Sequence, residues 1–217
     1  GSAPDRMPET LTIVLEFAAI AALVLANGFF VAAEFALVKI RSSQLRPMSA
    51  TGGWRVRFAL AATENLGAAL SATQLGITLT SLALGWIGEP IISHRIGPVL
   101  RTIGITDQSA ITSLSVVLGF SIITFSHIVL GELSPKALAI QRPKAVALNA
   151  AAPLMIFYRI FFPFIWLLNA SANRCLRLFG LEAAGKNEHA FSAEELEYVF
   201  SQARHSHPGD ALINRLM

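Results

Sequence analysis

The chain has 217 residues, of which 53% are hydrophobic and only 14% charged, and its mean hydropathy is +0.56. Soluble domains carry about 25% charged residues, so this composition excludes an ordinary soluble domain and indicates an integral membrane protein. The net charge of +3 comes from basic residues beside the apolar segments, which suits anionic lipid headgroups and argues against nucleic-acid binding. The single cysteine, Cys175, excludes an intrachain disulfide and a cysteine metal cluster.

Three segments approach or exceed the ~20 apolar residues that cross hydrocarbon, namely residues 11–38, 66–87 and 111–130. A fourth apolar stretch, 150–179, is interrupted by Pro153, Pro163 and several polar residues. It is better explained as kinked amphipathic helices at the inner surface than as a spanning helix, which remains the alternative. The predicted fold is therefore an all-α integral membrane protein with three transmembrane helices and juxtamembrane amphipathic helices.

Basic residues predict the orientation of the three spans. The link after the first span carries five of them, the link after the second is balanced by acids, and three more follow the third span. By the positive-inside rule, the N-terminus lies outside and the C-terminus lies in the cytoplasm, as in a multi-pass protein of the plasma (inner) membrane.

The ends of the chain differ from the apolar middle. Residues 1–10 are expected to be a tag remnant and an outer N-terminus, and residues 11–180 the transmembrane domain with its juxtamembrane helices. Residues 181–217 turn polar, and Ser192 and Glu195 form a capping box that opens an expected helix over 193–204. We expect this part to be the start of a cytoplasmic helical region that is cut short.

Polar residues within the first span are candidates for function, because they are expensive in hydrocarbon and usually face a bundle interior or a cavity. Asn27 and Glu34 lie seven residues apart and so share one helix face. Asn27 is expected either to serve the function or to hold the bundle together through an interhelical hydrogen bond. Glu34 lies near the inner link, where the alternative is an interfacial acid paired with Lys39 or Arg41.

The other two spans carry stripes of small and polar residues, which more often indicate close helix packing than transport. They are Ser71, Gln74, Thr78, Ser81 and Gly85 in the second span, and Thr112, Ser115, Gly119, Ile122 and Ser126 in the third. Both stripes are candidate dimer faces. Ser71 is the exception, because it lies near the inner end of its span at a depth expected for an ion ligand.

The end of the third span combines a carboxylate, a glycine and a proline in Gly131-Glu132-Leu133-Ser134-Pro135. Pro135 has no N–H to donate to the carbonyl of Gly131, so we expect the helix to end there and leave a backbone oxygen beside Glu132. The alternative is a helix terminated by proline, with Glu132 as a surface acid.

These residues predict a metal site made from Asn27, Ser71, Gly131 and Glu132. Amide, hydroxyl, carbonyl and carboxylate oxygens with one formal charge suit Mg²⁺ or Na⁺, whereas Ca²⁺ usually takes more ligands. The histidines at 94, 189, 205 and 207 are expected in loops or the tail, so no zinc site is predicted. No catalytic constellation or phosphate loop is present in the sequence, and we expect no enzyme activity.

Three motifs resemble the transmembrane domain of the CorC/cyclin-M (CNNM) magnesium transporter family, and they occur in the family's order. They are Ala26-Asn-Gly-Phe-Phe-Val-Ala-Ala-Glu34, Leu70-Ser-Ala-Thr-Gln-Leu-Gly-Ile-Thr-Leu79 and Leu130-Gly-Glu-Leu-Ser-Pro-Lys136. The resemblance covers residues 11–180. It implies a homodimer and Mg²⁺ export proposed to be coupled to Na⁺ entry, with cytoplasmic CBS domains in full-length relatives.

The resemblance places the ion site on the same four residues, with two departures. Many relatives have serine in place of Asn27 and a second serine in place of Val31. Asn27 keeps an oxygen ligand, whereas Val31 removes one and leaves either fewer protein ligands or more water. The leading hypothesis is a secondary Mg²⁺ exporter. The rival is a non-transporting membrane anchor or Mg²⁺ sensor for cytoplasmic regulatory domains.

Overall fold

The computed structural model describes residues 8–48 and 52–180, and every regular element in these ranges is helical. They fall into two compact units, one reaching Asn169 and one starting at Ala170, and the description below concerns the first. The expected capping box at Ser192 and helix over 193–204 lie outside the described residues, as do residues 1–7.

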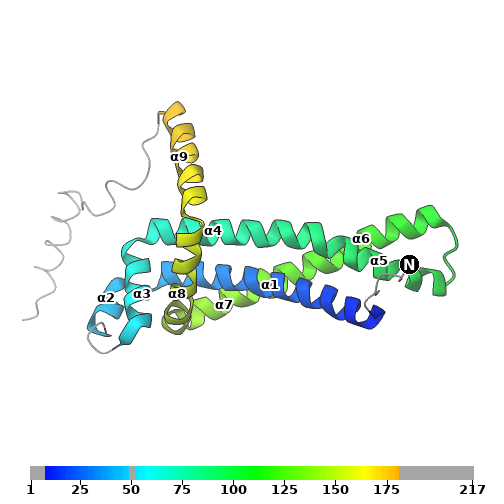
Figure 1. The fold of residues 1–217 in the computed structure, drawn as a ribbon, viewed down its shortest axis with the longest axis horizontal. Coiled ribbons are helices and arrows are strands. Elements are labelled where there is room, and N and C mark those ends of the chain that lie inside the picture. Colours follow the sequence, from blue (N-terminus) through cyan, green and yellow to red (C-terminus); the bar gives the residue numbers. More distant parts are fainter. Residues whose placement is uncertain (1–7, 49–51, 181–217) are drawn as a thin grey trace, which may run out of the picture. The chain divides into compact units, whose positions relative to one another are not determined.

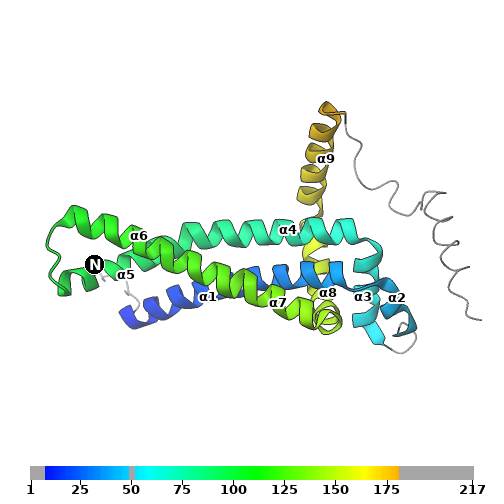
Figure 2. The ribbon, with the colours of Figure 1, turned by 180° about the vertical axis from the view of Figure 1, so that it is seen from behind.

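Three helical paths are long and apolar enough to cross a membrane, which confirms the three predicted spans. The first is α1 (Glu9–Lys39), with a mean hydropathy of 2.2. The second joins α4 (Leu66–Ala83), the π-helical segment η2 (Leu84–Gly88) and α5 (Glu89–Thr102). The third joins α6 (Gln108–Ser126), the π-helical segment η3 (His127–Leu133) and α7 (Ser134–Gln141). The three paths run side by side (Figure 1 and Figure 2).

The second and third paths correct two expectations. The helix does not end at Pro135: the π-helical segment η3, in which the Ser134 N–H donates to the Val129 carbonyl five residues back, leads directly into α7. Irregular turns of this kind are how membrane helices tolerate proline. His94 lies in α5 and not in a loop, because the second helix continues to Thr102 past the apolar segment.

The rest of the described residues form shorter helices. They are α2 (Ser42–Leu45), the 3₁₀ turn η1 (Arg46–Met48), α3 (Gly53–Glu64), α8 (Pro143–Ile160) and α9 (Phe162–Leu178). The apolar stretch over residues 150–179, for which kinked helices are expected, breaks at Phe161, and the bend between α8 and α9 is 79°. The kink is thus confirmed, whereas a position along the inner membrane surface stays a prediction.

Two apolar clusters form the core, and both include residues of α1. The smaller cluster contains Ile20 and Val24 of α1 with Leu84, Ile92 and Ile123. The larger begins at Phe30 and continues along α1 into α3, α4 and α8. Between the two lies Asn27, which is 0% exposed. A buried amide therefore separates the two apolar layers of the bundle.

Two glycines allow the helices around this layer to approach each other. A methyl group on Gly28 would lie 2.8 Å from the Cγ atom of Pro135, which brings α1 against the start of α7. A methyl group on Gly76 would lie 2.5 Å from the ring of Phe30, which is itself buried. These contacts set the spacing between α1 and its two neighbours.

Gly76→Ala is expected to destabilise the protein by about 1–3 kcal/mol, because the buried Phe30 ring cannot move away without disturbing the core. Gly67→Ala is the matched control on the same helix, since a methyl group there meets nothing within 4 Å. Thermal unfolding in detergent should show a lower melting temperature for the first variant and an equal or higher one for the second. Equal behaviour of the two variants would contradict the close contact.

Candidate ion-binding site

Asn27 joins α1 to the distorted part of the third span. Its Nδ2 atom donates to the carbonyl oxygen of Gly131 at 3.0 Å, and both residues are buried. Pro135 cannot bond this carbonyl, so the amide of Asn27 takes the place of the missing backbone donor. Two of the four predicted ligands are therefore in direct contact.

The carbonyl oxygen of the Asn27 side chain faces the second span. It accepts hydrogen bonds from Thr80 Oγ1 at 2.9 Å and from Ser81 Oγ at 3.2 Å. Thr80 Oγ1 also lies within hydrogen-bond distance of the carbonyls of Gly76 and Ile77 on its own helix. All three spans thus meet at one amide group, as the interhelical interpretation of Asn27 predicted.

His127 completes this polar layer. Its Nε2 atom lies 3.2 Å from Ser81 Oγ, so the imidazole connects the third span to the second. A methyl group on Gly131 would lie 3.0 Å from His127 Cδ2 and 3.2 Å from Asn27 Nδ2, which leaves no room for a side chain there. The sequence interpretation missed Thr80 and His127, although Ser81 was part of the predicted stripe.

Glu132 follows the Gly131 carbonyl directly and is half-buried. Neither of the two ion pairs found among the described residues involves it, and no hydrogen bond within them reaches its carboxylate. Glu132 is therefore a negative charge next to the Asn27–Gly131 contact that is not neutralised by a neighbour in residues 8–48 and 52–180.

Ser71 is not brought to this group. It precedes Thr80 by nine residues on α4, which corresponds to about 13 Å along the helix. Its hydroxyl lies 3.0 Å from the Gly67 carbonyl and accepts from Asn169 Nδ2 at 3.1 Å. A role for Ser71 in ion binding stays a prediction, and in this structure its partner is an amide on α9.

The expected pairing of Glu34 is not found in the structure. Lys39 donates instead to the Ile140 carbonyl at 2.9 Å, and neither ion pair among the described residues includes Glu34 or Arg41. Val31, the position of the departure from the family pattern, is a buried apolar residue of the core side of α1.

The chemistry of the cluster is that of an oxygen site. The described residues contain no group of three or more His, Cys, Asp or Glu side chains that could hold a metal ion. A site here would use the amide oxygen of Asn27, the hydroxyl of Ser81 or Thr80, the carbonyl of Gly131 and the carboxylate of Glu132. Such a hard donor set suits a small hard cation.

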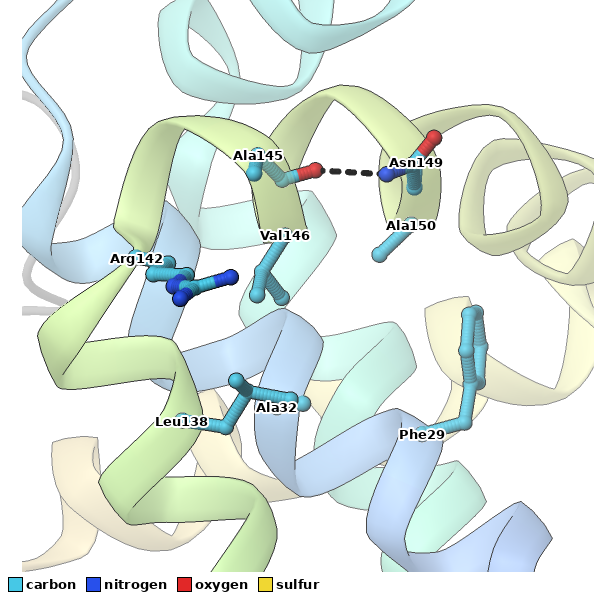
Figure 3. Close-up of a pocket in the computed structure, with 8 residues that line it drawn as sticks. All are labelled: Phe29, Ala32, Leu138, Arg142, Ala145, Val146, Asn149 and Ala150. Atoms are coloured by element: carbon cyan, nitrogen blue, oxygen red, sulfur yellow. Dashed lines mark hydrogen bonds between the residues drawn. The ribbon is translucent and has the colours of Figure 1, made fainter.

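A separate cavity of about 350 Å³ opens nearby between α1, α7 and α8 (Figure 3). Phe29, Ala32 and Leu138 line it, and Arg142 is the only charged residue among the described residues that line it. None of the four predicted ligands lines this cavity, and its walls are mainly hydrocarbon. This cavity is therefore unsuited to a cation, and the buried polar layer is the better candidate for the ion site.

Comparison with known proteins identifies the family of this chain. Residues 18–211 match the family described as the cyclin M transmembrane N-terminal domain. The chain belongs to the cyclin M transmembrane family. The polar layer described above lies within the matched residues.

Curated relatives share much of the chain. The UPF0053 protein YhdP of Bacillus subtilis is 43% identical over 85% of this chain and 41% of its own length. The UPF0053 protein YugS of the same organism is 41% identical over 88% of the chain and 44% of its length. The UPF0053 protein MT1890 of Mycobacterium tuberculosis is 35% identical over 95% of this chain and 45% of its own length. The chain thus spans less than half the length of these relatives.

Asn27→Ala is expected to destabilise the bundle by about 1–3 kcal/mol, because the Gly131 carbonyl would be left buried without a donor. Asn149→Ala is the control, since both hydrogen bonds of that amide, to the Ala145 carbonyl and from Arg55, are exposed. Thermal unfolding should show the larger loss for Asn27→Ala. Equal losses would mean that the Asn27–Gly131 bond does not hold the spans together.

Proposed function

We propose that this cyclin M domain is a secondary transporter that exports Mg²⁺ from the cytoplasm across the plasma membrane and couples this export to Na⁺ entry. The observation that carries the proposal is the Asn27–Gly131 contact, where a buried amide and a proline-released carbonyl lie beside an unneutralised carboxylate. A helix bundle that served only as an anchor would not need that charge at this depth.

The polar layer can accommodate a cation with a small rearrangement. Turning the Asn27 amide by about 180° would bring Oδ1 beside the Gly131 carbonyl and direct Nδ2 toward Thr80 and Ser81. Two oxygens facing each other are unfavourable alone but form part of a cation shell. Hydroxyls can accept as well as donate, so Thr80 and Ser81 can serve either orientation of the amide.

Glu132 would supply the charge and Gly131 the fixed oxygen. A divalent ion needs at least one anionic ligand to offset its dehydration, and Mg²⁺ keeps several waters because it loses them reluctantly. With Val31 in place of a possible ligand, we expect water to complete the shell. A site with few protein ligands binds weakly, which allows release of the ion after transport.

The same proposal includes a homodimer in the bilayer, with the N-terminus outside and cytoplasmic CBS domains in the full-length protein. The single chain supports a second copy on the second span, where Gln74 and Thr78 of α4 and Gly85 of η2, all in the predicted stripe, are exposed. Polar groups at membrane depth usually face a partner helix. The stripe of the third span is less suitable, because Ser115 and Gly119 are buried within the chain.

A non-transporting membrane anchor or Mg²⁺ sensor is the second candidate, and one observation favours the anchor. The Asn27 side chain has its donor and acceptor bonded within the protein, as a purely structural group would. Flux of Mg²⁺ into or out of proteoliposomes containing this chain separates the two candidates. Saturable flux supports the transporter, and binding without flux supports the sensor.

Glu132→Gln is expected to abolish Mg²⁺ binding at the Asn27 layer with little change in fold, because neutral dipoles cannot replace the hydration of a divalent ion. Isothermal titration calorimetry measures the affinity, and thermal unfolding checks the fold. Glu64→Gln is the control, since Glu64 is an exposed acid in an ion pair with Arg46 at 3.5 Å. Unchanged affinity in Glu132→Gln would remove this residue from the site.

Selectivity is expected to favour Mg²⁺ over Ca²⁺, because the site offers few protein ligands and Ca²⁺ prefers more and longer bonds. If Na⁺ competes for the same oxygens, raising Na⁺ at constant ionic strength should weaken the apparent Mg²⁺ affinity. Titrating Mg²⁺ against fixed Na⁺, with choline as the balancing cation, measures this. An affinity that does not depend on Na⁺ would mean that coupling uses another site.

A further inference from the structure

A second group of oxygens lies between α5 and α6, away from the Asn27 layer. Ser93 Oγ lies 2.5 Å from Glu89 Oε1 and 3.1 Å from the backbone carbonyl of Ser115. The serine has one proton and can donate to only one of these acceptors at a time. The other contact then joins two electron-rich oxygens, which a cation between them would stabilise.

Ser115 provides the independent observation. The residue is only 5% exposed, and its Oγ atom has no hydrogen-bond partner among the described residues. A buried hydroxyl without a partner costs about 1–3 kcal/mol, so its retention points to a ligand. The hydroxyl belongs to the same residue whose carbonyl contacts Ser93, which places a fourth oxygen source in the group.

The close approach of the two helices depends on Gly119. A methyl group there would lie 2.5 Å from Ser93 Oγ and 3.1 Å from the Ser93 backbone nitrogen. Glycine therefore lets Ser93 reach the Ser115 carbonyl. Gly119, the smallest residue of the predicted stripe in the third span, thus lies where the second oxygen group needs space.

A cavity of about 310 Å³ adjoins these oxygens, and both Ser93 and Ser115 line it. It has room for roughly ten waters at their volume in the liquid, enough for a partly hydrated ion. Pro98 also lines the cavity and cannot donate to the carbonyl of His94, another lining residue. A further backbone oxygen is thereby released from its usual helical partner.

The charges nearby are compatible with a cation. Arg95 is neutralised by Glu16 of α1, with Nη2 and Nε at 2.5 and 3.2 Å from the same carboxylate oxygen. Arg101, which also lines the cavity, donates to Gln108 and follows Glu89 by twelve residues, about 18 Å along the helix. His94 is exposed, and Glu89 is the carboxylate of the group.

We propose that Glu89, Ser93 and Ser115 form a second cation site, which takes a partly hydrated small hard cation such as Mg²⁺ or Na⁺. It lies about 12 Å beyond Ser81 along the same helical path, toward the predicted outer side of the membrane. The site holds ions between the Asn27 layer and the outer solution. It concerns binding alone, so it stands or fails independently of transport at Asn27.

Calorimetry on the full chain tests the site in a Glu132→Gln background, which removes the charge of the first site. Titration with MgCl₂, and separately with NaCl balanced by choline, should retain one binding event with at least one of the two ions. Adding Glu89→Gln should abolish it, and adding Ser115→Ala should weaken it about ten-fold or more, as expected for one ligand to a charged group. If the background variant binds neither ion, the proposal is wrong.

Two control variants distinguish a ligand from a structural group. Thr112→Val removes a hydroxyl that lines the same cavity but donates to Gln108 of its own helix, and it should leave ion binding unchanged. Glu64→Gln removes an exposed carboxylate on α3 and should likewise leave ion binding unchanged. In the Glu132→Gln background, Ser115→Ala should keep or raise the melting temperature without added ion and reduce the increase that the ion causes. An ion-dependent increase that is not reduced by Ser115→Ala in this background would overturn the proposal.

Discussion

Hydrocarbon offers no hydrogen-bond partner, so any backbone group that a distorted helix releases must be bonded by another part of the protein. Pro135 creates this requirement in the third span, and Asn27 meets it by donating to the Gly131 carbonyl at 3.0 Å. The remaining contacts around this layer depend on that bond. Gly28 must be small for α1 to reach Pro135, and Thr80 and Ser81 must face the amide oxygen.

The same constraint explains why the site lies between two apolar clusters. Ile20 and Val24 pack on one side of Asn27, and the larger cluster begins at Phe30 on the other. Close packing of these clusters fixes the relative height of the three spans, so the Asn27 amide is already positioned beside its partners. Hydrophobic packing therefore holds the spans together, and the hydrogen bonds of the polar layer fix their register.

The sequence predicted the parts of the fold that depend on composition and local chemistry. The apolar lengths located the three spans, and the missing N–H of Pro135 indicated the Gly131 carbonyl as a free acceptor. Thr80 and His127 could not be predicted, because their contacts with Asn27 and Ser81 depend on how the helices pack. Ser71 was assigned to the site by its depth and by the family resemblance, whereas the structure pairs it with Asn169, 98 residues away. Periodicity also gave no sign of η3, so the helix was expected to stop at a proline that it passes.

A π-helical turn holds one more residue than the α-helical turn that it replaces, and each α-helical residue advances the helix by about 100°. The η3 segment therefore rotates α7 about its axis relative to the direction that α6 would give it. Ser115 and Gly119 face α5, whereas Pro135 faces Gly28 of α1, so one span presents two different sides to two different neighbours. A helical wheel drawn through residues 108–141 as a single helix would misplace the side chains beyond His127.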